Sequence, residues 1–169
     1  MAVVNLKGSL VMTDLDATPI VLADPGQAGG NVRTWIDTVE VGAADTTSST
    51  YLMARLPSNC IILPQSTVYW DDLTTTGSPT VDVGVYNLSG QSDITDDPDA
   101  LSNGHDVTSA GSASLITAGA SISTFGIPLW DHVASVTTDP KTNLDIKLKL
   151  VDAPVVGGGT MSVVIFYTE

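Results

Sequence analysis

The segment Leu144-Asp145-Ile146-Lys147-Leu148-Lys149-Leu150 alternates apolar and charged residues without interruption. In a β-strand, successive side chains point to opposite faces, so the four apolar residues of this segment gather on one face. A helix would scatter the same residues around its circumference. The pattern therefore predicts a strand with its apolar residues toward a core, and with Asp145 and the two lysines toward water.

The same period of two recurs along the chain between turn-forming residues. Residues 81–86 alternate valines with Asp82 and Gly84, and the glycine indicates a bulge or the close approach of another backbone. Residues 32–41 predict a strand with Trp35, Asp37, Val39 and Val41 on one face. Shorter strands are predicted at residues 51–56, 60–63 and 67–70.

The last apolar segment, residues 161–167, is apolar at both odd and even positions. In a sandwich of two sheets this pattern is typical of a central strand with one face in the core. Its other face then requires a cover, and the candidates are the N-terminal segment of the chain or another subunit.

Helical signals are few. In residues 95–101, an aspartate cap, Pro98 and the following Asn103-Gly104 predict one or two helical turns. Connections rich in Ser, Thr, Gly and Asp are predicted at residues 43–50, 74–79, 109–114 and 156–159. About nine strands at such spacing favour an all-β, jelly-roll-like β-sandwich over an alternation of strands and helices.

The first 30 residues differ from the rest of the chain. Two short apolar runs, residues 10–12 and 20–22, precede a Gly-rich joint at residues 24–30. We expect residues 1–30 to form an extended N-terminal arm and residues 31–169 to form the sandwich domain. An ordinary first strand and loop of the same sandwich is the alternative for this segment.

The charge balance argues against two classes of partner. The 169 residues contain 6 Lys plus Arg against 19 Asp plus Glu, which gives a net charge of -13. Direct binding to nucleic acid or to an anionic membrane surface depends on basic residues, so both are disfavoured. The first residues lack a secretory signal, and no apolar run approaches the length of a membrane span. We therefore expect a soluble protein made in the cytoplasm.

Nucleophilic catalysis requires a hydroxyl or thiol beside a base, and no such motif is present. The single cysteine, Cys60, lies in an apolar run and is predicted to be a buried, inert thiol. His105 and His132 each have an aspartate as chain neighbour, but neighbours on a strand point to opposite faces. Both histidines are therefore interpreted as solvated loop residues, and we predict no catalytic residue and no enzymatic activity.

Metal and cofactor motifs are incomplete. Asp97-Pro98-Asp99 alternates as calcium ligands do, but the following glycine and the distant glutamate of a calcium loop are missing. A loosely held structural ion stays open for the acidic cluster Asp93, Asp96, Asp97, Asp99 and Asp106 and for Asp71-Asp72. One cysteine and two separated histidines do not make a zinc site. Gly157-Gly158-Gly159-Thr160 lacks the lysine and the helix of a phosphate loop and is interpreted as a hairpin turn. We expect no cofactor.

Aromatic residues offer the remaining candidate for ligand binding. Most of them occupy alternating positions in predicted strands, which favours core packing over a sugar-binding face. The set comprises Trp35, Trp70, Trp130, Tyr51, Tyr69, Tyr86 and Tyr167.

Several segments, in order, resemble a family of small virion proteins of tailed bacteriophages. They are residues 38–41, 49–59, 82–87, 97–101, 128–130 and 139–140, followed by the amphipathic strand, Gly-rich turn and apolar strand that end on Tyr167. No segment is a catalytic signature, and the match is thin over the first 30 residues.

The resemblance implies a capsid decoration, or cement, protein on the outer surface of the phage head. It implies the major capsid protein as the partner and a homo-oligomer, with a trimer favoured. Two other functions stay open: a tail, neck or fibre component, and a carbohydrate- or receptor-binding β-sandwich.

Overall fold

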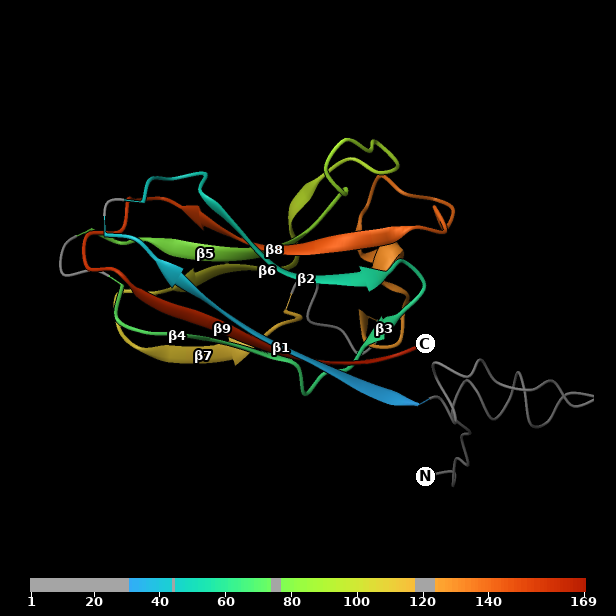
Figure 1. Cartoon of the computed structure of the whole chain (residues 1–169), viewed down its shortest axis with the longest axis horizontal. Helices are drawn as coiled ribbons and strands as arrows, with labels where there is room; N and C mark the ends of the chain where they lie inside the picture. Colours follow the sequence, from blue (N-terminus) through green and yellow to red (C-terminus); the bar gives the residue numbers. More distant parts are fainter. Residues whose placement is uncertain (1–30, 44, 74–76, 118–123) are drawn as a thin grey trace, which may run out of the picture.

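The computed structural model describes residues 31–43, 45–73, 77–117 and 124–169, which form nine strands in two antiparallel sheets (Figure 1). Sheet A contains, in spatial order, β1 (Val32–Val41), β9 (Gly159–Thr168), β4 (Thr67–Trp70) and β7 (Gly111–Ser114), with β3 (Ile61–Ile62) also paired to β9. Sheet B contains β2 (Thr50–Pro57), β8 (Asn143–Val151), β5 (Thr80–Tyr86) and β6 (Asp97–Asp106). A short 3-10 helix, η3 (Leu129–His132), precedes β8.

The order of the strands is that of a jelly roll. Leaving out the two-residue β3, the first strand pairs with the last, β1 with β9, and the second with the second to last, β2 with β8. The inner strands continue the scheme, because β4 pairs with β7 and β5 with β6. This nesting of antiparallel pairs, folded into two facing sheets, confirms the predicted β-sandwich of jelly-roll type.

The core lies between the sheets and follows the alternation read from the sequence. Leu144, Ile146, Leu148 and Leu150 of β8 are fully buried. They face residues of β9 in the other sheet, among which Val163 and Ile165 are also fully buried. The predicted strand 32–41 is confirmed with its bounds, and β9 is the predicted central strand, lying between β1 and the pair β3 and β4.

The predicted helix at residues 95–101 is wrong, because this segment enters the edge strand β6. The carboxylate of Asp96 accepts a hydrogen bond from the main-chain N–H of Asn87 and so does not cap a helix. Pro98 is tolerated because an edge strand leaves one row of N–H groups unpaired. The main chain at Asp97 and Pro98 passes directly over Gly84, where any Cβ would collide with it, so the predicted close approach at Gly84 is confirmed.

Two predicted connections differ from the structure. The Gly-rich segment 157–160 is not a hairpin turn, because β8 and β9 belong to different sheets and the segment crosses between them. Gly158 has a φ of +72° there, a conformation that favours glycine. The predicted connection at residues 109–114 also differs, because its last four residues form β7, which pairs with β4.

The expected N-terminal arm, residues 1–30, lies outside the described residues. Its separation from a 31–169 domain therefore stays a prediction. Within the described part of the chain, no helix is long and apolar enough to cross a membrane.

Candidate docking surface

The outward-facing side of sheet A is nearly free of charge. Strands β3, β4, β7 and β9 contain no charged residue, and only β1 contributes any to this sheet. The register places Ile36 beside Val164 and Tyr69 beside Ser162 on the outer face. Ile36 is 68% exposed and Tyr69 46% exposed, so the face is open to solvent at both. We call this surface the sheet A face; its residues are Val32, Thr34, Ile36, Thr38, Glu40, Thr160, Ser162, Val164, Phe166, Thr67, Tyr69, Ser112 and Ser114, of which Glu40 alone is charged.

The outer side of β9, for which the sequence predicted a cover, is only partly covered within the sheet A face. Val164 and Phe166 point away from the core and are only half-buried, as the apolar run at both odd and even positions predicted. The side chains around them are short hydroxyls, such as Thr38, whose Oγ1 lies 2.8 Å from Oγ of Ser162. Apolar groups ringed by hydroxyls can be buried against a partner without desolvating a charge.

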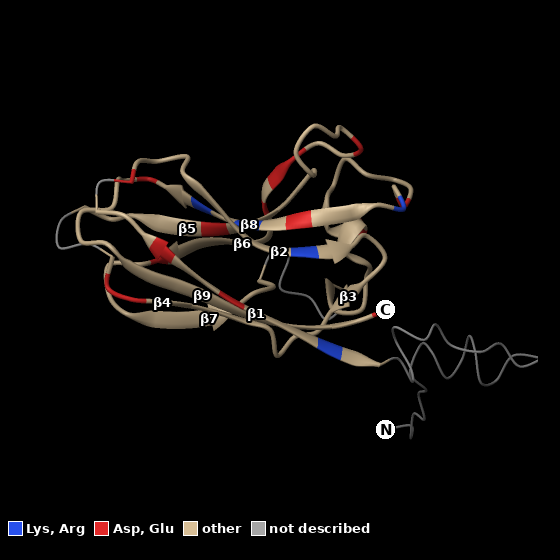
Figure 2. Ribbon diagram, viewed as in Figure 1, with Lys and Arg blue, Asp and Glu red and all other residues tan. Residues whose placement is uncertain are grey.

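The outward-facing side of sheet B is charged by contrast. Figure 2 shows red and blue segments on β2, β5 and β8, whereas β9 and β7 are tan along their length. Lys147 lies over the ring of Tyr86, 4.8 Å from its centroid. The main chain of β6 covers this face at Gly84. The outer face of sheet B is therefore both charged and partly closed by its own chain.

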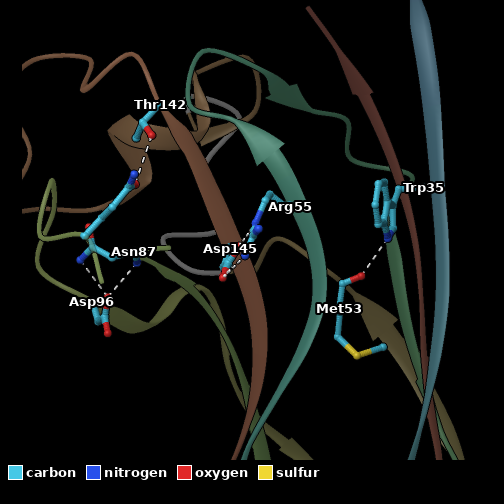
Figure 3. Close-up of polar contacts among 8 residues, drawn as sticks. Trp35, Met53, Arg55, Asn87, Asp96, Thr142 and Asp145 are labelled. Atoms are coloured by element: carbon cyan, nitrogen blue, oxygen red, sulfur yellow. Dashed lines mark hydrogen bonds and ion pairs between the residues drawn. The ribbon is translucent and has the colours of Figure 1, made fainter. Parts of the chain in front are cut away.

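Asp145 departs from the prediction that it faces water. It is 2% exposed, and the guanidinium of Arg55 covers it with two hydrogen bonds, of 2.7 Å from Nε and 3.2 Å from Nη2 (Figure 3). The pair joins β2 to β8 at directly opposed positions. Hydrogen bonding to Asp145 raises the pKa of Arg55, which stays charged.

Two carboxyl groups of β5 and β6, those of Asp82 and Asp97, take up a proton more easily than an isolated aspartate does. Burial raises the pKa of Asp97, and a hydrogen bond with the Asp99 carboxylate adds to the effect. Burial likewise raises the pKa of Asp82. The pKa of Tyr86 rises to about 12, first through burial and then through repulsion from Asp96 and nearby carboxylates. Its buried hydroxyl has no hydrogen-bond partner within the described residues.

One side of the sandwich is formed by the outer strands of both sheets, β1 and β2. The indole Nε1 of Trp35 donates a hydrogen bond of 2.8 Å to the carbonyl oxygen of Met53 and so ties the two edges together (Figure 3). Beside this bond lies an open groove of about 370 Å³, lined by Trp35, Asp37, Leu52, Met53, Ala54 and Arg55. Leu52 and Trp35 remain substantially exposed at its rim.

Cys60 is completely buried, as predicted, and pairs with no other cysteine. Burial raises the pKa of its thiol to about 12, so the reactive thiolate is scarce at neutral pH. The prediction of an inert thiol is consistent with this environment.

The two histidines are not solvated loop residues, so that interpretation is wrong. His105 lies in β6, stacks on Trp70 and has Nε2 2.8 Å from Oγ of Ser102. Burial lowers the pKa of His105 and also that of His132, which lies in η3. No motif in the sequence indicates the Ser102–His105 pair. Ser102 is 0% exposed, so its hydroxyl cannot reach a substrate from solvent.

The candidate metal ligands do not converge. Within residues 31–43, 45–73, 77–117 and 124–169, no three His, Cys, Asp or Glu side chains are close enough to hold an ion. Asp71 instead accepts hydrogen bonds from the main-chain N–H and the hydroxyl of Thr160, which lower its pKa. Asp106 accepts one from the N–H of Thr108, and its pKa is lowered likewise.

The aromatic residues divide between core and surface. Tyr86 and Tyr167 are buried, and Tyr51, Trp70 and Trp130 pack against the core, as predicted. Trp35 and Tyr69 are exposed, so the prediction of core packing is wrong for these two. Trp35 lies on the core-side face of sheet A and Tyr69 on its outer face, and the two rings therefore form no common platform for a sugar.

The fold recurs in solved phage capsids. A chain of the structure titled "Capsid of Ralstonia phage GP4" superposes with a TM-score of 0.60 and 20% identity, covering 83% of this chain and 85% of that one. A chain of "Cyanophage Pam1 capsid asymmetric unit" gives a TM-score of 0.54 and 21% identity, covering 90% and 95%. No protein-family model matches the sequence, and no curated protein matches it. At such identities the likeness establishes a shared fold.

Proposed function

We propose that this chain is a non-enzymatic structural protein of a tailed-phage virion. In this role it is a decoration protein that binds the major capsid protein on the outside of the assembled head. The observation that carries the proposal is the sheet A face, an open surface with a single charged residue, Glu40, on a chain whose net charge is -13. The jelly roll shared with chains of two phage capsid structures supports the same role.

The distribution of charge explains how such a protein stays soluble before assembly and still docks in one orientation. The acidic residues repel other copies and non-specific partners. The sheet A face costs little to desolvate, since its polar atoms are chiefly hydroxyls and strand-paired main chain. Docking by this face leaves the charged face of sheet B toward solvent.

The size of the sheet A face fits a contact that is repeated many times on a shell. Its longest strands have 10 residues each, which corresponds to roughly 34 Å, and four strands span about 15 Å between their outer axes. The area is on the order of 500 Å², below the roughly 800 Å² per partner of a standard interface. A decoration protein of this kind therefore gains from binding as an oligomer, and the family resemblance favours a trimer.

The open functions differ in what they require of the surface. A carbohydrate-binding sandwich needs clustered exposed aromatics, whereas Trp35 and Tyr69 lie on opposite faces of sheet A. A tail, neck or fibre component would also use an uncharged face, so its distinction from a decoration protein is positional.

Binding to heads tests the proposal directly. Full-length chain is titrated onto phage heads that lack it, and bound chain is measured after sedimentation. We expect saturable binding with a copy number in fixed ratio to the major capsid protein. Absence of binding to heads, or binding confined to tails or necks, would contradict the decoration role.

A further inference from the structure

Of the four outer strands of the two sheets, β1 is the least protected against pairing with another strand. In natural proteins, an edge strand is protected against pairing with another chain by being short or by carrying proline, a bulge or charge. The edge β2 has a bulge between Leu52 and Ala54, and β6 carries Pro98 and two irregularities in register. The edge β7 has only four residues.

The edge β1 is long and lacks proline and bulges, and charge is the only one of these devices that it has, at Arg33, Asp37 and Glu40. It runs for 10 residues in unbroken register with β9 and contains no proline or lysine. Its exposed side chains include Val32, Trp35 and Ile36. Within the described residues, only β9 pairs with it, so one row of its N–H and C=O groups faces outward.

We propose that two copies of this chain pair through β1, antiparallel and about a two-fold axis at Trp35. In an antiparallel ladder, opposed residues are of the same type, both hydrogen-bonded or both not. When a strand pairs with the same strand of a second copy, one residue must therefore lie opposite its own equivalent. The two-fold axis passes between these two equivalent residues. Each such residue defines one register.

The charges of β1 select the register. An axis at Trp35 places Arg33 opposite Asp37 of the second copy, twice by symmetry. Axes at the neighbouring positions 34, 36 and 37 oppose Arg33 to an uncharged residue, and the last also sets Asp37 against itself. Opposed cross-strand charges stabilise a pair and like charges destabilise it. Arg33 already bonds Glu169 at 2.9 Å, but its five-donor fork can serve a second carboxylate and it is more than half exposed.

The pairing extends the proposed docking surface, although it does not depend on any capsid. Thr34 lies opposite Ile36 of the second copy on the outer side, so the two sheet A faces join into one continuous face whose only charged residue in each copy is Glu40. This doubles the area to on the order of 1,000 Å², within the range of stable interfaces. The symmetry is two-fold, which gives a dimer in place of the trimer that the resemblance favours.

The full-length chain tests the proposal in solution by sedimentation equilibrium and light scattering. We expect a mass of twice the single chain that falls on dilution. Arg33→Asp and Asp37→Arg should each raise the dimer dissociation constant about tenfold or more, and the double exchange should restore it. Glu169→Gln is the matched control, because it removes the bond to Arg33 within one chain and should leave the dimer intact.

Cross-linking tests the register independently of affinity. Cysteines at Thr34 and Ile36 in one chain should form two disulfides between copies, since opposed Cα atoms lie within bridging distance. Thr34→Cys alone should not cross-link, because it faces Ile36 of the second copy. A single-chain or triple-chain mass at all concentrations, no rescue by the double exchange, or equal cross-linking of the single cysteine would overturn the proposal. Because no head is present, these outcomes are separate from those that test head binding.

Discussion

The outer faces of the two sheets have the same architecture and opposite chemistry. On sheet B, charged side chains occupy every strand, Arg55 covers Asp145, and the β6 main chain closes over Gly84. On sheet A, the outer face offers Ile36, Val164 and Tyr69 among hydroxyls. In both sheets, every second side chain along a strand points into the core. This difference between the two outer faces is the basis of the proposed docking through sheet A.

The comparison shows that the acidic residues are unevenly distributed over the surface of the domain. A net charge of -13 would repel any partner if it were uniform. Most of the excess acid lies in the loops, and the outer face of sheet A carries charge only at Glu40, so contact by that face removes mainly apolar and hydroxyl surface from water. Four substitutions can break or sharpen this contrast.

Closure of the sheet B face depends on Gly84, and its substitution has the largest expected effect. In Gly84→Ala the new Cβ would collide with the main chain of Asp97 and Pro98, which cannot move as a side chain would. We expect the free energy of unfolding to fall by about 3 kcal/mol or more, measured by urea denaturation. In the control Gly42→Ala the nearest atom is a flexible carboxylate oxygen of Asp45 at 3.2 Å, and the loss should stay below about 1 kcal/mol. Equal losses would show that β6 does not cover Gly84.

Adding a charged side chain to the sheet A face, like those on sheet B, should weaken its docking. Tyr69→Lys places a positive charge among the apolar and hydroxyl side chains of this surface, and we expect binding to phage heads to weaken at least about tenfold, measured by co-sedimentation. The matched variant Asn103→Lys adds the same charge on the exposed edge strand β6 and should bind normally. If both variants bind alike, the sheet A face is not the contact.

The Arg55–Asp145 pair tests whether the charges of sheet B are structural. Arg55→Met leaves the carboxylate of Asp145 buried without its cation, so the midpoint of urea unfolding should fall. Combining it with Asp145→Leu removes the orphaned charge and should recover part of the loss. A double variant less stable than Arg55→Met would indicate that Asp145 is held by other groups.

The smallest expected effect concerns Asp97, which shares a hydrogen bond with Asp99. Its pKa is raised in the folded state, so the folded protein binds more protons than the unfolded chain and stability falls as pH rises through that raised pKa. Asp97→Asn removes this penalty and should stabilise the protein at pH 7 by on the order of 0.5 kcal/mol, after allowance for solvent screening. The gain should disappear near pH 4. A gain that is constant with pH would contradict the account.

The sequence predicted the fold where the period of two was clear. Strands 32–41, 81–86 and 144–150 follow from alternation alone, and their number and spacing indicate a jelly roll. The segment 95–101 failed because local cap signals also occur at the start of an irregular edge strand. Only the tertiary contact with Gly84 decides between the two, and that contact is not encoded locally.

The sequence predicted that β9 has an apolar outer face, but it did not predict which other strands complete the docking surface. The two-sided apolar pattern of residues 161–167 indicated a face in need of cover. Its neighbours Ile36 and Tyr69 come from strands far away in sequence, which only the register brings together. Asp145 was misplaced for the same reason, because alternation assigns a face but does not reveal that Arg55 covers it.

Cryo-electron microscopy of the assembled phage particle tests the central claim most directly. The account predicts density for this jelly roll on the outside of the head, with Ile36, Val164 and Tyr69 against the major capsid protein and the β5 and β8 face toward solvent. A particle in which the charged sheet B face contacts the shell, or a head that carries no copy of this chain, would contradict it.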